Sequence, residues 1–401
     1  MSSTGPIVLF LGRLAGDGVA RNAVHLANAL VQRGLAVQVV CLQPGPLAED
    51  LRGAGLTCLG WARGPRGLAL AAATGALRRE LQALRPSVVV SMGNHGHLAV
   101  WAALRGLPDV PRIYRISNDP AHAGADPLRR AAREAGLRLV AADATRLVCV
   151  SAALARGPAF RRARRDRRID VLSNGVDVEA IRRRATAPVR HPWVDDGRPY
   201  VVAVGRLHPQ KNYPRLLDAL RLARESRPEL RLLVLGGGPD KARAALEAQA
   251  RGAGVADAVR FEGEVADPFP LVARASAYVL ASRWEGASNS LLEALACGVP
   301  VVASRSAGAA PDVLGHGRFG VLVDPDSPSD LARGLLAQTD PATRILPGGR
   351  AGDFPLDANL ARLCAVVAGA RRLHDEIQML VEGQSHGPAL SAVIPQRSTE
   401  C

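Results

Sequence analysis

The clearest local pattern in the chain is Y-V-V-A-V-G-R-L-H-P-Q-K-N, residues 200–212. Tyr200–Val204 is a short apolar run followed by a glycine, which is typical of a buried strand in a parallel sheet. Ligands bind to open α/β sheets at the carboxyl ends of their strands. We therefore expect Arg206 and Lys211, on the loop behind this strand, to neutralise an anion. A solvated loop is the plainer alternative, but lysine is not the default in a chain with 49 arginines and two lysines.

The alternation of strand and helix continues in both directions and predicts an α/β fold with two doubly wound parallel sheets. In the first half the predicted strands are Ile7–Leu11, Val37–Leu42, Ser87–Ser91, Arg112–Ile116, Leu147–Val150 and Ile169–Leu172. In the second half the further predicted strands are Leu230–Leu235, Val259–Glu262, Ala277–Ala281 and Pro300–Ala303. The helices predicted between them are Leu216–Glu225, Lys241–Gly252, Pro268–Ala275 and Ser290–Cys297.

A proline-rich stretch at 188–198 interrupts this alternation and predicts a linker. The predicted organisation has a basic first domain at 1–187 and a second domain at 199–350. Helices at 351–382 are expected to cross back to the first domain, and 383–401 is expected to be a flexible tail. Two α/β domains joined by one loop can hold a ligand between them.

The composition is that of a globular protein. Of 401 residues, 48% are apolar and 22% are charged, which argues against wholesale disorder. No apolar run approaches the ~18 residues of a membrane-spanning helix, and Ile7–Leu11 is too short for a signal peptide. The six cysteines form no C-x-x-C pair. We expect free thiols in a reducing cytoplasm, and exclude a secreted, disulfide-stapled or membrane-spanning protein.

Positive charge is concentrated in the first half. Residues 1–200 hold 29 Lys and Arg against 15 Asp and Glu, whereas residues 201–401 hold 22 of each. This asymmetry favours an anionic partner, either an acidic membrane surface or nucleic acid, although a GC-rich genome also favours arginine. Nucleic acid is not expected, because no nucleic-acid motif occurs and aromatic residues are scarce among the arginines. The densest cluster consists of Arg161, Arg162, Arg164, Arg165, Arg167 and Arg168.

The loop Gly16-Asp17-Gly18 joins the first predicted strand to a helix. No third glycine follows at the dinucleotide-binding spacing, and the second strand ends at Gln43 without an acid to hold an adenosine ribose. A dinucleotide-dependent dehydrogenase is therefore not expected. The loop is either a simple tight turn or a place where backbone N–H groups approach an anion.

A second constellation is E-G-A-S-N-S-L-L-E at 285–293. Glu285 follows a predicted strand, and Ser288 or Asn289 is placed to cap the next helix. The N–H groups of that first turn offer a phosphate site. Glu293 lies among apolar residues and needs a polar partner such as a ligand hydroxyl, although an exposed helical glutamate is the plainer alternative.

The region from Val201 to about Asp330 resembles the retaining, nucleotide-sugar-dependent glycosyltransferases of family four. Their GT-B fold has two Rossmann-like domains that face each other across a cleft. The motif S-x-W-E-G-x-x-N-x-L-L-E-A most resembles that of the bacterial branch that builds lipid-linked oligosaccharides, lipopolysaccharide and exopolysaccharide. The matching motifs are G-R-L-x-x-x-K-N at 205–212, G-G-G-P at 236–239, the Glu285/Glu293 pair, E-A-L-A-C-G-V-P-V-V-A-S at 293–304 and G-V-L-V at 320–323. Weaker matches are Gly16–Gly18, Val150-Ser151 and Asn174–Asp177.

The resemblance implies a role for each matching position. Arg206 and Lys211 would neutralise the departing diphosphate, Glu285 would contact the transferred sugar, and Glu293 would bind the ribose. The other donor-binding residues that the resemblance implies are Gly18, Gly205, Glu262, Gly263, Glu264, Ala287, Ser288, Asn289 and Ser290. It implies no cofactor and no metal, so we interpret D-P-D at 324–326 as a loop rather than a metal-binding D-x-D motif.

One position departs from the family pattern. Many members carry a histidine after the strand that here is Arg112–Ile116, and this histidine touches the donor sugar. The chain has Ser117, Asn118 and Asp119 instead. His95 and His97 on the preceding loop are candidate substitutes, and Asn118 is a further candidate contact for the sugar or the acceptor.

The sequence thus predicts a glycosyltransferase that moves a sugar, with retention, from a nucleotide-diphosphate sugar to a glycan or lipid-linked acceptor in cell-surface polysaccharide synthesis. The second domain would hold the donor. The basic first domain would hold the acceptor and rest on the inner face of the plasma membrane through the arginines of 161–168. The alternatives are a non-catalytic scaffold of the same fold, a basic nucleic-acid- or membrane-binding protein, and a sugar-nucleotide epimerase with the GT-B fold.

Overall fold

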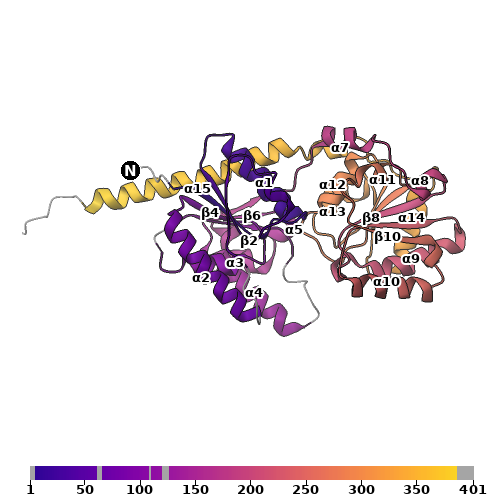
Figure 1. The fold of residues 1–401 in the computed structure, drawn as a ribbon, viewed down its shortest axis with the longest axis horizontal. Coiled ribbons are helices and arrows are strands. Elements are labelled where there is room, and N and C mark those ends of the chain that lie inside the picture. Colours follow the sequence, from indigo (N-terminus) through magenta and orange to yellow (C-terminus); the bar gives the residue numbers. More distant parts are fainter. Residues whose placement is uncertain (1–4, 61–65, 108–109, 120–125, 386–401) are drawn as a thin grey trace, which may run out of the picture.

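The computed structural model describes residues 5–60, 66–107, 110–119 and 126–385. These residues form two lobes that lie end to end, each built on a parallel β-sheet (Figure 1). The first sheet has the strand order β3-β2-β1-β4-β5-β6-β7 and the second has the order β10-β9-β8-β11-β12-β13. The expectation of two doubly wound sheets is therefore confirmed.

The first lobe contains the elements up to β7. Its strands are β1 (Ile7–Arg13), β2 (Val37–Gln43), β3 (Gly55–Cys58), β4 (Val88–Ser91), β5 (Arg112–Ile116), β6 (Arg146–Cys149) and β7 (Ile169–Val171). Its helices are α1 (Gly18–Val31), α2 (Arg66–Leu84), α3 (His97–Leu104), α4 (Pro127–Asp143), α5 (Ala152–Ala155) and α6 (Arg161–Arg165), with short 3₁₀ turns η1 (Pro46–Ala48) and η2 (Pro158–Phe160).

The second lobe follows, and a last helix returns from it. Its strands are β8 (Tyr200–Val204), β9 (Arg231–Leu235), β10 (Val259–Gly263), β11 (Ala277–Leu280), β12 (Val301–Ser304) and β13 (Val321–Val323). Its helices are α7 (Val178–Ala185), α8 (Pro192–Asp195), α9 (Tyr213–Ser226), α10 (Asp240–Gly252), α11 (Phe269–Ala273), α12 (Asn289–Ala296), α13 (Ala310–Val313) and α14 (Pro328–Thr339), and the last helix is α15 (Leu356–Ser385). Its 3₁₀ turns are η3 (Pro209–Lys211), η4 (Ala256–Ala258), η5 (Gly315–Gly317) and η6 (Arg350–Asp353).

The central strands are buried on both faces, as parallel strands covered by helices are. In β1, Leu9 packs into a core formed with α1 and α15, whereas Val8 and Phe10 pack into a core formed with α2, α3 and α4. The strand β8 divides its side chains between two helical layers in the same way. This two-sided burial produces the continuous apolar runs that mark the strands in the sequence.

The chain passes between the lobes at two adjacent places. The first crossing follows β7 at residues 173–175, and the second precedes α15. The two crossings are paired, since the Val176 N–H donates to the Phe354 carbonyl at 2.9 Å and the Leu356 N–H donates to the Val176 carbonyl at 3.2 Å. A Cβ atom at Gly175 would lie 2.6 Å from the Leu356 Cα, so a glycine is needed for this close approach.

The linker predicted at 188–198 is therefore not the crossing between the lobes. The helix α7 and the residues around α8 already belong to the second lobe, where Ile181 and Trp193 are buried in its core. Trp193 lies beneath the guanidinium of Arg231, whose carbon is 4.6 Å from the ring centre. Prolines and glycines mark loops inside a domain as well as between domains, and for this reason the composition shift was misleading.

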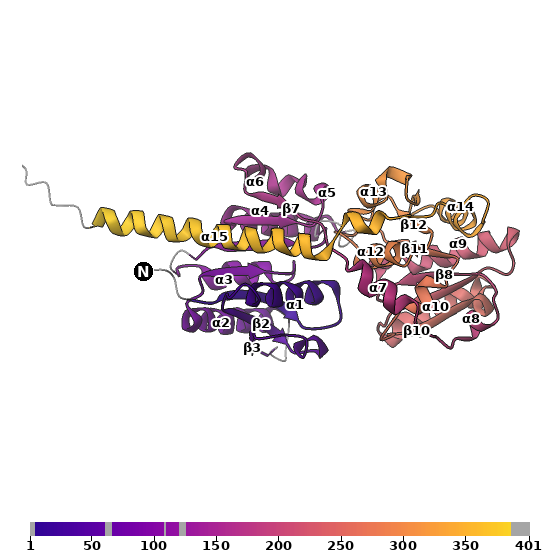
Figure 2. The same ribbon diagram turned by 90° about the horizontal axis from the view of Figure 1, so that it is seen from above.

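The helix α15 runs back along the first lobe (Figures 1 and 2). Leu363, Cys364, Val367 and Ala370 are buried in the core that α1 also lines. The helix continues to Ser385, which lies beyond the predicted start of the tail at 383. Residues 386–401 lie outside the described part of the chain.

The five cysteines in the described part of the chain are free thiols. Cys41 and Cys58 are register partners on β2 and β3, and their sulfur atoms lie 3.3 Å apart. Among the residues that the structure describes, no helix has the length and apolar character required to span a membrane.

Candidate active site

The loop between β11 and α12 carries Glu285 to the carboxyl edge of the second sheet. The helix begins at Asn289, and the Ser288 hydroxyl caps it by accepting a hydrogen bond from the Leu291 N–H at 3.4 Å. Gly308 lies against this loop with φ +55°, and a Cβ atom there would lie 2.3 Å from the carbonyl oxygen of Glu285. Close packing of backbone on backbone therefore fixes the position of the loop.

Lys211 and Glu285 meet at this edge as a buried ion pair. The Lys211 Nζ lies 2.7 Å from Glu285 Oε1, and the two side chains are only 18% and 10% exposed. The Ser282 hydroxyl donates to the same oxygen at 2.9 Å. The two charged residues follow β8 and β11, which are neighbours in the sheet, so the strand order brings them together.

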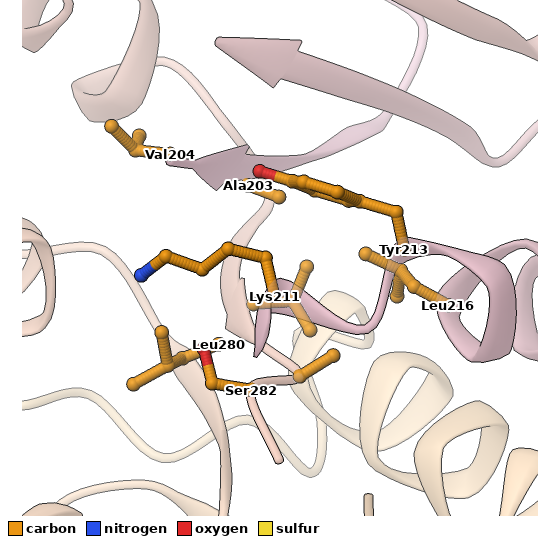
Figure 3. Close-up of a pocket in the computed structure, with 9 residues that line it drawn as sticks. Ala203, Val204, Lys211, Tyr213, Leu216, Leu280 and Ser282 are labelled. Atoms are coloured by element: carbon orange, nitrogen blue, oxygen red, sulfur yellow. The ribbon is translucent and has the colours of Figure 1, made fainter. Parts of the chain in front are cut away.

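The local backbone holds Lys211 in place. Asn212 has a left-handed conformation with φ 58°, and its buried amide donates to the Pro325 carbonyl at 2.7 Å. Asparagine adopts this conformation more readily than most residues, which gives the Lys-Asn pair of the motif a structural reason. The Lys211 side chain extends between Tyr213 and Ser282, and its ammonium group points away from Leu216 (Figure 3).

The strand ends next to Lys211 are glycines. A Cβ atom at Gly205 would lie 2.7 Å from Lys211 Cε, so this glycine leaves room for the lysine chain. The neighbouring strands end at Gly236 and Gly263, and both glycines have positive φ. The Gly236 N–H donates to the Gly263 carbonyl at 2.7 Å. Glycines at the strand ends allow a ligand to approach the backbone closely.

A small cavity of about 10 Å³ lies beside Lys211 and is lined also by Tyr213, Leu216 and Ser282. The Tyr213 hydroxyl donates to the Gly205 carbonyl at 2.7 Å. Burial raises the pKa of Tyr213, so the phenol stays protonated and keeps donating this bond.

The first lobe meets this edge of the second lobe directly. A Cβ atom at Gly18, in the first turn of α1, would lie 2.8 Å from the amide nitrogen of Asn289. A Cβ atom at Gly286 would lie 2.2 Å from the Ser117 carbonyl oxygen, which follows β5. The carboxyl edges of the two sheets thus face each other, with two predicted glycine-rich segments at their contact.

An ion pair joins the lobes at Glu293. The Arg21 Nη1, on α1, lies 2.9 Å from Glu293 Oε1 on α12, and the glutamate side chain is 15% exposed. Glu293 therefore has a polar partner, as its apolar surroundings required. Arg21 is not predictable from the sequence, because no local pattern distinguishes it from the other arginines of the first lobe.

A second polar connection runs through Asn174 at the first crossing. Its amide donates to Asn289 Oδ1 at 2.6 Å and to the Ala287 carbonyl at 2.9 Å. Its own oxygen accepts a hydrogen bond from the buried Arg115 Nη2 at 2.6 Å. Burial lowers the pKa of Arg115 to about 10. Asn174 lies in a weakly matching motif of the sequence, but its partners lie in both lobes and no spacing could identify them.

Other predicted donor-site residues have different surroundings. Arg206 is exposed, and among the residues described here no ion pair involves it. Glu262 is bonded to His191 at 3.2 Å and to Arg260 at 2.9 Å, beside a pocket of about 490 Å³ between α10 and β10. Its carboxylate is therefore not part of the Lys211–Glu285 cluster. Glu264 is exposed and packs against Gly237.

The candidate histidines do not share one surface. His97 is buried, with its Nδ1 2.7 Å from the Ser91 hydroxyl and its ring edge-on to Tyr114. Burial lowers the pKa of His97 to about 3, so the ring is neutral and the residue serves the packing of the first lobe. His95 is exposed. Asn118 is held by its carbonyl, which accepts a hydrogen bond from the Asn94 amide at 2.7 Å.

Asp324-Pro325-Asp326 forms the loop after β13. The Asp326 N–H donates to Asp324 Oδ1 at 3.0 Å, and the Asp324 N–H donates to Asp330 at the start of α14. In the part of the chain that the structure describes, no three His, Cys, Asp or Glu side chains are grouped so as to hold a metal ion.

The arginine cluster at 161–168 divides into two kinds. Arg164 donates to the carbonyls of Ala155 and Gly157, and Arg168 donates to the carbonyls at the end of α4, so both cross-link the first lobe. The other four are exposed, namely Arg161, Arg162, Arg165 and Arg167. Of these, Arg162 and Arg165 form exposed ion pairs with Asp166 at 3.7 and 3.3 Å.

Comparison with known proteins places this geometry in a family. A model described as "Glycosyl transferases group 1" matches residues 198–339, and one described as "Glycosyltransferase Family 4" matches residues 16–180. The chain is 30% identical over 413 aligned positions to a D-inositol 3-phosphate glycosyltransferase of Geodermatophilus obscurus, covering 94% of this chain and 90% of the relative.

It is 35% identical over 196 residues to a GDP-mannose-dependent alpha-(1-6)-phosphatidylinositol monomannoside mannosyltransferase of Mycobacterium tuberculosis. This match covers 45% of the chain and 50% of that relative, so the chain spans only half of the relative's length.

The crystal structure of Anabaena HepE in complex with UDP and glucose has the same fold, with a TM-score of 0.71 at 18% identity over 91% of this chain and 100% of that one. Because the two family descriptions cover both lobes and a relative matches over almost its whole length, the chain belongs to the family 4 glycosyltransferases and has their GT-B fold.

Proposed function

We propose that this protein transfers a sugar, with retention, from a nucleotide-diphosphate sugar to a glycan or lipid-linked acceptor of cell-surface polysaccharide synthesis. The observation that carries the proposal is the Lys211–Glu285 pair next to the first turn of α12, at the edge where the lobes meet. The names of the relatives support it, since one is GDP-mannose-dependent and acts on a phosphatidylinositol glycolipid.

The cations of the second lobe act on the leaving group. As the sugar–phosphate bond breaks, negative charge develops on the nucleoside diphosphate, and preorganised cations stabilise a transition state where charge develops. Lys211 is fixed by Glu285 and Asn212, whereas the exposed Arg206 is free to turn toward the phosphates. The N–H groups at the start of α12 add dipoles of the same sign.

The two glutamates hold the sugars on either side of the diphosphate. Glu285 accepts hydrogen bonds from the hydroxyls of the transferred sugar, and Glu293 accepts those of the ribose. The glycines at 205, 236 and 263, which follow or end their strands with positive φ, allow the nucleotide to approach the backbone closely. Because two cations and a helix terminus neutralise the diphosphate, the proposal includes no metal ion.

The first lobe binds the acceptor and rests on the inner face of the plasma membrane, so the protein works in the cytoplasm. Its charge excess and the four exposed arginines of 161–168 support an anionic lipid surface as partner. The loop of Asn118, next to the contact between Ser117 and Gly286, is a candidate contact for the sugar or the acceptor.

The first experiment is a thermal-shift screen of UDP, GDP and their sugar conjugates, because a ligand that binds only the folded protein raises its melting temperature. The stabilising donor is then incubated with lipid-linked and glycan acceptors, with and without EDTA, and the anomeric proton of the product is followed by NMR. We expect transfer in EDTA, with the donor's anomeric configuration kept. An inverted product contradicts retention, and loss of transfer in EDTA contradicts the metal-free site. Nucleotide binding with no transfer to any acceptor favours the scaffold alternative.

A further inference from the structure

A row of hydrogen bonds, the amide chain Arg115–Asn174–Asn289, connects the first lobe with the start of α12. The Arg115 Nη2 donates to Asn174 Oδ1 at 2.6 Å. The amide nitrogen of Asn174 donates to Asn289 Oδ1 at 2.6 Å and to the Ala287 carbonyl at 2.9 Å. Arg115 is 4% exposed and Asn174 is 7% exposed, so most of the amide chain is enclosed between the two lobes.

The direction of each bond in the amide chain is fixed by chemistry. A guanidinium group only donates hydrogen bonds and a backbone carbonyl only accepts them, whereas a side-chain amide does one at each of its two ends. Asn174 lies between Arg115 and the Ala287 carbonyl, so its oxygen faces the arginine and its nitrogen faces the second lobe. Asn289 then presents its oxygen to Asn174, because two amide nitrogens cannot share a hydrogen bond.

The amide nitrogen of Asn289 is consequently turned away from Asn174. A Cβ atom at Gly18 would lie 2.8 Å from this nitrogen, which therefore lies beside the glycine loop of the first lobe. Within the described part of the chain, the bond to Asn174 is the only side-chain hydrogen bond of Asn289, and the residue is partly exposed. Its two N–H groups are thus available to a ligand.

We propose that Asn289 donates a hydrogen bond from its side-chain amide to the diphosphate of the nucleotide sugar, and that Asn174, held by Arg115, is the positioning residue that turns this amide toward the ligand. The inference rests on the proposed function, which places the diphosphate at the first turn of α12. An N–H donor at that place stabilises the negative charge of the departing diphosphate, whereas an amide oxygen repels it.

The substitution Asn174→Asp isolates the directional role of Asn174. Aspartate has nearly the same shape and still accepts the bond from Arg115, but an ionised carboxylate cannot donate to Asn289. The Asn289 amide then turns its nitrogen toward the new carboxylate and its oxygen toward the ligand. Asn174→Ala removes the same bonds without this reversal, so the Asn289 amide stays free to turn.

The two variants should differ in stability in the opposite order. Among the residues that the structure describes, Arg115 forms no ion pair with a carboxylate. Asn174→Asp supplies this counter-charge, whereas Asn174→Ala leaves the buried guanidinium without its acceptor. We expect Asn174→Asp to have the higher melting temperature of the two and yet the lower affinity for nucleotide. A purely structural role of Asn174 gives the same order in both measurements.

Isothermal titration calorimetry of the full chain measures the dissociation constants of UDP and GDP. For the preferred nucleotide, affinity should fall about ten-fold in Asn174→Asp and in Asn289→Ala, the contribution of one hydrogen bond to a charged group, and at most about three-fold in Asn174→Ala. The double variant Asn174→Asp/Asn289→Ala should bind like Asn289→Ala alone, because the positioning role needs the Asn289 amide.

The control is Asn28→Asp, which makes the same chemical change at an exposed position of α1, ten residues or about 15 Å along the helix from Gly18. It should leave nucleotide affinity unchanged.

Binding by Asn174→Asp that is as tight as that of Asn174→Ala overturns the inference. A further loss when Asn174→Asp is added to Asn289→Ala also overturns it, since the new charge then acts on the nucleotide directly. If Asn174→Ala does not fold, the comparison of Asn174→Asp with and without Asn289→Ala decides alone. If neither nucleotide binds the wild-type chain, the proposed function fails rather than the positioning role of Asn174.

Discussion

Among single residues, Lys211 and Glu285 are the pair whose loss should be most informative. Replacing Lys211 with Ala removes a cation from the proposed leaving group and leaves the Glu285 carboxylate, 10% exposed, without its counter-charge. We expect transfer to fall about 100-fold or more and the free energy of unfolding to fall by about 2–3 kcal/mol. Enzyme assay and urea unfolding measure the two effects.

The chain offers a matched control in Lys241, its only other lysine, which is exposed on α10. Lys241→Ala should keep both activity and stability. Full turnover by Lys211→Ala would remove this residue from the site.

His97 makes the stability of the first lobe depend on pH. Burial lowers its pKa to about 3, whereas an unfolded histidine titrates near 6.5. The unfolded chain therefore binds the proton first as the pH falls below 6.5, and the contribution of the neutral ring, complete above 6.5, is lost between 6.5 and 3 at about 1.4 kcal/mol per pH unit.

Urea unfolding at pH 7.5 and 5.0 should show a loss of about 2 kcal/mol from this histidine, and His97→Asn should reduce the loss. Carboxylates such as Asp196, whose pKa is lowered by hydrogen bonds from Arg231, act only at lower pH. An unchanged pH dependence in His97→Asn would show that other groups dominate.

Residues of the same site differ in how well the sequence alone predicts them. Lys211, Glu285 and Glu293 lie in short segments after predicted strands, so local pattern alone placed them at a sheet edge. Arg21 is 272 positions from its partner Glu293 and lies on the other lobe. His97 was a candidate because it follows a predicted strand on a loop, where functional histidines often lie. Its ring is instead buried against Tyr114 and Ser91. The Arg21–Glu293 pair depends on how the lobes meet, and the burial of His97 depends on how the first lobe packs; the spacing of residues in the sequence records neither.

At the scale of elements, the loop between β11 and α12 depends on Gly286. Because Gly286 has no side chain, the loop can contact the Ser117 carbonyl. A Cβ atom at Gly286 would lie 2.2 Å from that oxygen. We expect Gly286→Ala to leave each lobe folded but to push the two carboxyl edges apart. Transfer should fall at least about ten-fold because reacting groups a fraction of an ångström out of place lose orientation.

The measurement compares initial rates with nucleotide affinity. Nucleotide affinity should change little, because Lys211 and Glu293 are untouched. A variant with normal rates would show that the contact between Gly286 and Ser117 is not needed for the reaction. Gly252→Ala, at the end of α10 where a Cβ meets no atom, is the control.

Strands were predictable where helices cover both faces of the sheet. The bounds of β5 and β8 agree with the predicted ranges. The strand β8 is a continuous apolar run, whereas β5 keeps buried apolar residues around the buried Arg115. β3 was missed, since it is a four-residue edge strand that is largely exposed. α7 was placed in the wrong domain, because its apolar residues Ile181 and Ala185 reveal a buried face but not which sheet it covers.

At the scale of the molecule, α15 makes the first lobe depend on the far end of the chain. Val367, on this helix, is fully buried against the core around α1. Val367→Ala should lower the free energy of unfolding by about 2 kcal/mol, the cost of two lost methyl groups and a small cavity. Arg362→Ala, exposed on the same helix, should cost less than about 0.5 kcal/mol. Equal effects in urea unfolding would mean that α15 does not stabilise the lobe.

The charge asymmetry of the whole molecule leads to a prediction about membranes. The exposed arginines Arg161, Arg162, Arg165 and Arg167 should contribute about 1 kcal/mol each near an anionic surface. Replacing all four with Ala should abolish sedimentation with vesicles rich in anionic lipid while leaving the melting temperature unchanged. Binding of the wild type should weaken as salt rises, because screening shortens the reach of the charges.

The two partly buried members of the cluster separate this effect from simple damage to the fold. Arg164 and Arg168 donate to backbone carbonyls, so Arg164→Ala and Arg168→Ala should lower the melting temperature and keep most of the vesicle binding. This opposite pattern follows because Arg164 and Arg168 bond to backbone carbonyls while the other four arginines are exposed, although all six form one cluster in the sequence. If the quadruple variant sediments like the wild type, or if neutral vesicles bind equally well, the basic lobe has no role at an anionic surface.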